Sequence, residues 1–202
     1  VDILHAAGVP REVLQCLPGP GETVGAALVA DPRVQGVMFT GSTVVARGIH
    51  RSLAARADIP LVAETGGINA MIVDSSALPE QVVADVLASA FDSAGQRCSA
   101  LRVLCVQEEI AGAVLHMLKG AMAELRVGPP EDFASDLGPL IDADALAAVT
   151  AHCDGMRAAG REVLQEGLAE ACGVGGYFPP TLICVHDLDD VRKEVFGPVL
   201  HF

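Results

Sequence analysis

The 202-residue chain is 51% hydrophobic but only 3% aromatic, so it can bury a core built mainly from Ala, Val and Leu. Such a core is typical of a parallel sheet flanked by helices, and we expect an α/β fold. The formal net charge of -13, with no basic run to offset it, argues against nucleic acid or an anionic membrane surface as a partner.

The cysteines and histidines point to a reduced protein without metal. The six cysteines form no Cys-x-x-Cys pair and the six histidines are scattered, so we expect neither a disulfide framework nor a metal site. No signal peptide and no long uncharged apolar span is present, and we expect a cytoplasmic location without membrane insertion. The chain begins at Val1 rather than at methionine and ends within an expected strand, which indicates a piece of a longer polypeptide.

The first forty residues predict short elements separated by turns. Residues 2–8 resemble the end of a helix closed by a glycine, and residues 13–17 favour a short strand. A Pro-Gly-Pro-Gly turn separates that strand from a small helix over 23–30. A second strand is expected over 36–40.

The string Phe39-Thr40-Gly41-Ser42-Thr43 joins that strand to a helix expected over 44–56. A glycine and hydroxyls before a helix N-terminus are suited to binding a phosphate group. The local alternative is a turn at Gly41 with an N-cap at Ser42 or Thr43. No Gly-x-Gly-x-x-Gly string supports an ordinary dinucleotide site.

An acid follows at the end of the next apolar run. The run that starts at Ile59 predicts a strand, and Gly66-Gly67 predicts a tight exit from it. Glu64 is therefore a carboxylate at a strand end beside flexible backbone. From the local pattern alone, a solvated surface acid is the competing interpretation.

Cys98 lies on a short connection between a helix and a strand. Apolar residues recur at helical spacing from Val82 to Ala94, Gly95 ends that pattern, and residues 101–106 predict a buried strand. A thiol on this connection is within reach of a substrate. By composition alone, a small buried hydrophobic side chain is the alternative.

The remaining elements alternate between helix and strand. One-sided helices are expected over 110–121, closed near residues 128–130, and over 143–158. A short strand is expected over 162–165, and residues 175–182 approach another. The string Glu194-Val195-Phe196-Gly197-Pro198-Val199 is locally a turn with one exposed acid.

These strings together resemble the aldehyde dehydrogenase superfamily over essentially the whole chain. Gly95-Gln96-Arg97-Cys98 resembles the nucleophile motif, and Glu64-Thr65-Gly66-Gly67, which begins 34 residues before the thiol, resembles the general-base motif. The run from Phe91 to Leu104 is similar to the L-glutamate-γ-semialdehyde (Δ1-pyrroline-5-carboxylate) dehydrogenase domain of the proline utilisation A flavoenzymes.

The resemblance implies a role for six residues. These are Cys98 as nucleophile, Glu64 as general base, Gly41 and Ser42 near the phosphates of NAD, and Glu194 and Phe196 at the nicotinamide ribose. A thiol, a base and a hydride acceptor are what the oxidation of an aldehyde through a thioester requires.

The resemblance also implies an organisation and a set of partners. We expect residues 1–66 to be the second half of a Rossmann-like NAD domain, and residues 67–202 to be most of an α/β catalytic domain. The expected partners are a small-molecule aldehyde, the remainder of the parent polypeptide and further copies in a homo-oligomer. The family's asparagine oxyanion donor and substrate loop have no counterpart here. The alternatives are a dehydrogenase for another aldehyde, or a catalytically silent structural module.

Overall fold

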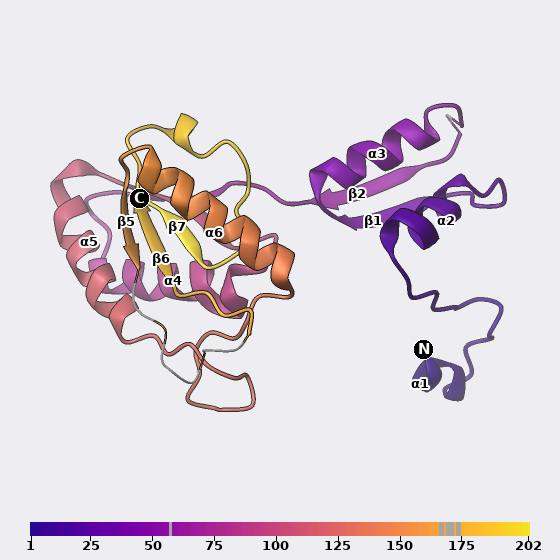
Figure 1. Cartoon of the computed structure of the whole chain (residues 1–202), viewed down its shortest axis with the longest axis horizontal. Helices are drawn as coiled ribbons and strands as arrows, with labels where there is room; N and C mark the ends of the chain where they lie inside the picture. The colour runs from indigo at the N-terminus through magenta and orange to yellow at the C-terminus, as the bar shows by residue number, and fades with distance from the viewer. Residues whose placement is uncertain (57, 166–167, 169–171, 173–174) are drawn as a thin grey trace. The chain divides into compact units, whose positions relative to one another are not determined.

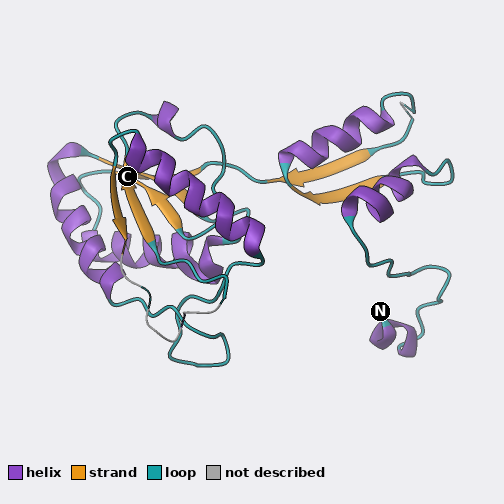
Figure 2. Cartoon of the chain, in the orientation of Figure 1, coloured by secondary structure: helices purple, strands orange, loops and turns teal. Residues whose placement is uncertain are grey.

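The computed structural model describes residues 1–202 except 57, 166–167, 169–171 and 173–174. Its contacts divide the chain into two compact units, Val1–Thr65 and Gly66–Phe202. Both units combine helices with parallel strands (Figures 1 and 2), which confirms the predicted α/β class. Among the described helices, none combines the length and hydrophobicity needed to span a bilayer.

The Val1–Thr65 unit is built on two strands joined by a helix. Its elements are α1 (Asp2–Ala6), a π-helical turn η1 (Gly21–Gly25) that continues into α2 (Ala26–Ala30), β1 (Val37–Gly41), α3 (Thr43–Leu53) and β2 (Leu61–Thr65). β1 and β2 are parallel, as a crossover through α3 requires. Since parallel strands end at the same edge, the residues that follow β1 lie beside the end of β2.

The strand predicted over residues 13–17 is wrong. These residues form no regular element, and Val13 and Leu17 are exposed. A strand needs a neighbour to satisfy its backbone groups, and the described pairing of this unit involves β1 and β2 alone. The residues between Pro10 and Pro18 therefore have the composition of a strand, but no described strand pairs with them.

The Gly66–Phe202 unit contains a five-stranded mixed sheet. Its elements are β3 (Asn69–Val73), α4 (Pro79–Phe91), η2 (Asp92–Gly95), β4 (Leu101–Val106), α5 (Glu108–Ala123), α6 (Ala143–Ala158), β5 (Glu162–Gln165), β6 (Thr181–Cys184), η4 (Leu188–Asp190) and β7 (Val199–His201). The strand order is β3-β4-β7-β6-β5, and all neighbours are parallel except β5 and β6.

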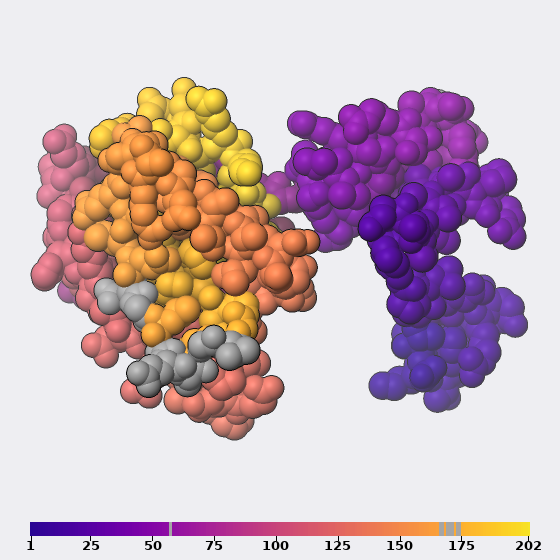
Figure 3. Space-filling view, in the orientation of Figure 1, coloured from indigo at the N-terminus to yellow at the C-terminus, as the bar shows by residue number. Residues whose placement is uncertain are grey.

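Helices cover both faces of this sheet, so its central strands alternate between two cores. Leu182 and Leu200 pack with α4 and α5, whereas Ile183 and Val199 pack with α6. Figure 3 shows α6, in orange, forming much of the visible surface over this second face. Burial on both faces explains why most residues of β6 and β7 are apolar; the polar exceptions are Thr181 and His201.

Three predicted helix ends are wrong. The helix expected over 44–56 ends at Leu53. The helix expected to run to Ala94 ends at Phe91, because a left-handed turn follows it. The helix expected to close near residues 128–130 ends at Ala123. The strand over 101–106 and the helix over 143–158 are confirmed with the same ends.

Candidate active site

The turn before Cys98 has an unusual backbone. Ser93, Ala94 and Gly95 have φ angles of 57°, 53° and 65°, in the left-handed region. A Cβ at Gly95 would stand 2.6 Å from the carbonyl carbon of Gly197 and 2.9 Å from the carbonyl oxygen of Ala90. Only glycine fits there, for reasons of both space and conformation. The turn carries the chain from α4 to an exposed thiol at Cys98.

The side chain of Asn69 holds the thiol loop from the neighbouring strand. Its Nδ2 donates to the carbonyl oxygen of Cys98 at 2.8 Å and to that of Ala100 at 2.9 Å. Asn69 begins β3, which pairs with β4 directly after the loop. The amide thus fixes the peptide groups that follow Cys98 and Ala100, and with them the backbone that carries the thiol.

Gln96 ties the same loop to a second segment. Its Nε2 donates to the carbonyl oxygen of Pro139 at 3.2 Å, and its Oε1 accepts from the backbone N–H of Ile141 at 2.8 Å. Two bonds to one short segment fix the side-chain amide in both orientation and position. Gln96 in the nucleophile motif is therefore a structural clamp between the loop and residues 139–141.

Arg97, adjacent to the thiol in sequence, directs its guanidinium toward α4. Its Nη2 donates to the carbonyl oxygens of Ala88 at 2.8 Å and Ser89 at 3.4 Å. These carbonyls belong to the last turn of the helix, where acceptors lack helical partners. The guanidinium of Arg97 therefore caps the end of α4.

Glu194 and Phe196 meet the thiol loop through a buried arginine. Arg102, only 1% exposed, places Nη2 at 3.3 Å from Oε1 of Glu194, and its guanidinium carbon lies 5.6 Å from the Phe196 ring centre. Burial lowers the pKa of Arg102, and the nearby Glu194 carboxylate acts in the opposite direction. A Cβ at Gly66 would overlap the Glu194 carboxylate, so the backbone there lies directly against it.

Glu64, Gly41 and Ser42 gather at one end of the two-stranded sheet. Thr40 pairs with Glu64 and Gly41 pairs with Thr65, so the exposed Glu64 and the start of α3 lie at the same edge. The hydroxyl of Ser42 accepts from the backbone N–H of Val45 at 3.3 Å, which makes Ser42 the N-cap of α3.

The structure does not bring all predicted site residues into one unit. Glu64, Gly41 and Ser42 belong to Val1–Thr65, whereas Cys98, Glu194 and Phe196 belong to Gly66–Phe202. The catalytic pairing of Cys98 with Glu64 therefore stays a prediction.

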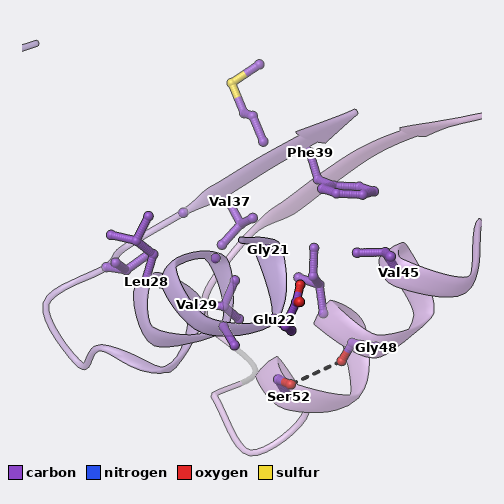
Figure 4. A pocket seen from close by; sticks show the side chains of 15 residues that line it. Gly21, Glu22, Leu28, Val29, Val37, Phe39, Val45, Gly48 and Ser52 are labelled. Atoms are coloured by element: carbon purple, nitrogen blue, oxygen red, sulfur yellow. Dashed lines mark hydrogen bonds between the residues drawn. The ribbon is translucent and has the colours of Figure 1, made fainter. Parts of the chain in front are cut away.

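The Val1–Thr65 unit also contains an apolar cavity of about 710 Å³ between η1, α2, β1 and α3 (Figure 4). Its apolar lining includes Val29, Val37 and Val45. A Cβ at Gly25 or Gly48, which also line it, would have no neighbour within 4 Å and would project into free space. The size and lining suit a flat organic ring.

Sequence reasoning assigned no role to two residues that organise the site. Arg102 carried a signal, because a charge within the apolar run Leu-Arg-Val-Leu-Cys-Val is unusual for a buried strand. Asn69 carried no such signal in the sequence, since β3 was not predicted as a strand. Its role depends on the pairing of β3 with β4.

The sequence matches the aldehyde dehydrogenase family over residues 1–202. It is 60% identical to "Bifunctional protein PutA" of Klebsiella aerogenes, covering 100% of this chain and 16% of that protein. It is 34% identical to the 1-pyrroline-5-carboxylate dehydrogenase of Geobacillus kaustophilus, covering 100% of this chain and 40% of that protein.

Two of the solved structures that resemble this chain illustrate the shared fold. A Bradyrhizobium japonicum Proline Utilization A (PutA) mutant superposes with a TM-score of 0.93 at 46% identity, covering 99% of this chain and 20% of that one. Betaine aldehyde dehydrogenase from Staphylococcus aureus in complex with NAD+ gives a TM-score of 0.93 at 26% identity, covering 99% and 41%. The chain thus spans less than half the length of each of these relatives.

Proposed function

The chain belongs to the aldehyde dehydrogenase family. We propose that the longer protein that contains it oxidises L-glutamate γ-semialdehyde to L-glutamate with NAD. The observation that carries the proposal is the 60% identity to a bifunctional PutA protein across the whole chain. The likeness to a 1-pyrroline-5-carboxylate dehydrogenase supports the choice of aldehyde. The NAD complex of a structural relative supports the cofactor.

The residues present fit a nicotinamide dinucleotide. The apolar cavity of the Val1–Thr65 unit suits an adenine ring, and the free space at Gly25 and Gly48 leaves room for its face. Gly41 and Ser42 precede α3, whose N-terminal amides favour phosphate. NAD, when bound, accepts the hydride that leaves the aldehyde carbon.

On the second unit we assign Glu194 to the nicotinamide ribose and Phe196 to the nicotinamide ring. Glu194 is held by Arg102, and Phe196 is 44% exposed, so the ring has a face available for a ligand. An exposed aromatic face beside a fixed carboxylate suits a ribose with an attached flat ring.

The proposed chemistry begins at the thiol. The thiolate of Cys98 adds to the aldehyde carbon, and the resulting alkoxide collapses as the hydride departs, which leaves a thioester on Cys98. Glu64 then removes a proton from water, the hydroxide adds to the thioester carbon, and the C–S bond breaks to release the carboxylate. The backbone N–H of Cys98 is a candidate donor to the oxyanion.

We place this activity in the cytoplasm. All six cysteines lie in the described part of the chain and are free thiols, which suits a reducing compartment.

The test is NADH formation by the full-length protein with a panel of aldehydes. Glutamate γ-semialdehyde should give a kcat/KM well above those for succinate semialdehyde and betaine aldehyde, and Cys98→Ser should abolish turnover with every aldehyde. A preference for another aldehyde would support the competing dehydrogenase function. If no aldehyde is oxidised while NAD still binds, the segment has a purely structural role.

A further inference from the structure

Arg102 joins two chain segments that the proposed function uses separately. Its Nη1 donates to the carbonyl oxygen of Gly197 at 3.1 Å, and its Nη2 donates to the carbonyl oxygen of Arg97 at 3.1 Å and to Oε1 of Glu194 at 3.3 Å. Arg97 directly precedes the thiol, whereas Glu194 and Gly197 belong to the turn before β7. One side chain therefore spans the thiol loop and that turn.

Stability alone is a poor reason for a charge at this position. Desolvation is the main cause that lowers the pKa of Arg102, so the charged form is disfavoured there. Replacing a buried ion pair by apolar groups of similar size is often neutral or stabilising. The neighbours Leu101, Val103 and Leu104 are buried and apolar, so the guanidinium is the one charged group in this part of β4. What the guanidinium supplies is a rigid planar fork of donors.

The Glu194 carboxylate is bonded on one oxygen and confined at the other. Oε1 accepts from Arg102, and Oε2 lies close to the backbone of Gly66, where a Cβ would overlap it. The side chain of Glu194 is 20% exposed, which leaves part of the carboxylate open to a ligand. The Glu194 carboxylate is therefore fixed in orientation and still accessible to a ligand.

We propose that Arg102 is a positioning residue that fixes Glu194 and Phe196 relative to the Cys98 loop. The inference rests on the proposed function, in which Glu194 and Phe196 hold the nicotinamide end of the cofactor. Loss of the guanidinium would free Glu194 to change rotamer and remove one of the supports of Phe196. A displacement of about 1 Å at a reacting centre can cost on the order of 100-fold in rate.

A double-mutant cycle in the full-length enzyme tests the link to Glu194. Arg102→Met should raise KM for NAD and lower kcat/KM by about 10- to 100-fold. Glu194→Gln should have a similar effect, and the double variant should be no worse than the poorer single variant, because both changes remove the same held carboxylate. Independent, multiplying effects would overturn the proposal, as would an unchanged KM for NAD in Arg102→Met.

Arg161 offers a matched control. It forms a two-point pair with Asp190 in the same unit, at 2.9 Å for both Nε and Nη2, and makes no described contact with the thiol loop. Arg161→Met should lower the thermal midpoint without changing KM for NAD. Equal KM changes in the Arg161 and Arg102 variants would show a general structural effect and refute a positioning role.

Two further measurements keep the result interpretable. If Arg102→Met does not fold, Arg102→Lys retains the charge but lacks the planar fork, and it should still weaken NADH binding. NADH titration without aldehyde separates the two proposals. Absent turnover in the wild type would refute the proposed substrate, whereas unchanged NADH affinity in both Arg102 variants would refute the role of Arg102.

Discussion

Gly95→Ala should destabilise the turn before Cys98 by about 2–5 kcal/mol. A left-handed φ of 65° costs a residue with a Cβ roughly 1–2 kcal/mol. The new Cβ would also press against the Gly197 carbonyl group and the Ala90 oxygen, and overpacking of this kind costs roughly 1–3 kcal/mol. Since Gly197 cannot yield without disturbing Arg102, we expect the turn to open locally rather than relax.

Hydrogen exchange in the full-length protein measures this opening. Amides of residues 92–100 should exchange about 30- to 4,000-fold faster, because each 1.4 kcal/mol corresponds to about a factor of ten. Gly120→Ala is the control, since Gly120 is exposed within α5 and its Cβ would meet nothing within 4 Å. The free energy of unfolding of the Gly120→Ala variant should increase by about 0.5–1 kcal/mol. Wild-type exchange and full activity in Gly95→Ala would refute the steric argument.

Three further predictions concern the thiol, the base and the pair formed by the half-buried His152 and the buried His201. Mass mapping after limited iodoacetamide treatment of the full-length protein should show Cys98 labelled before Cys184, because burial raises the pKa of Cys184. Cys98 should also be labelled before the other exposed thiol, Cys16. Earlier labelling of Cys16 would contradict the assignment of Cys98 as the nucleophile. Glu64→Gln should retain a pre-steady-state burst of NADH but slow the turnover that follows, because only thioester hydrolysis needs the base; equal loss of both phases would show that Glu64 acts earlier. Burial lowers the pKa of His152 to about 4, so the unfolded state binds more protons than the folded state below about pH 6.5, and stability present at pH 7 should be lost as the pH falls toward 4. The thermal midpoint of His152→Gln, whose amide can still donate to His201, should fall less over this range, whereas exposed His116→Gln should match the wild type.

Elements with a local signal were predicted well from the sequence. The β4 strand lies in a run that is apolar except for Arg102, and the α6 helix has apolar residues at helical spacing; the ends of both were predicted correctly. The same reasoning failed for Val13–Leu17, because a strand is defined by its neighbour and not only by its composition. It placed the end of α4 too late, because the turn at Ser93–Gly95 is shaped by contact with Gly197.

The parts of the site differ in the same way. Cys98 and Glu64 stand in recognisable strings, so they could be proposed from the sequence. Asn69 and Arg102 act through residues that are distant along the chain, as the bond from Arg102 to Gly197 illustrates. A single sequence can reveal such a residue only when its type is unusual for its surroundings. The charged Arg102 is unusual within an apolar strand, whereas Asn69 is not unusual where it stands.

The dependence of the thiol loop on Gly197 has a consequence for the order of folding. Arg102 and its acceptor are 95 residues apart, so the contact closes a long loop and forms after the local helices. At about 5–20 residues per second, synthesis reaches Gly197 roughly 5–20 seconds after Arg102. During that interval α4 and α5 can pair, but the turn that presents Cys98 lacks the Gly197 backbone against which Gly95 packs. The nascent chain therefore carries its nucleophile for several seconds before the contacts that orient it are complete.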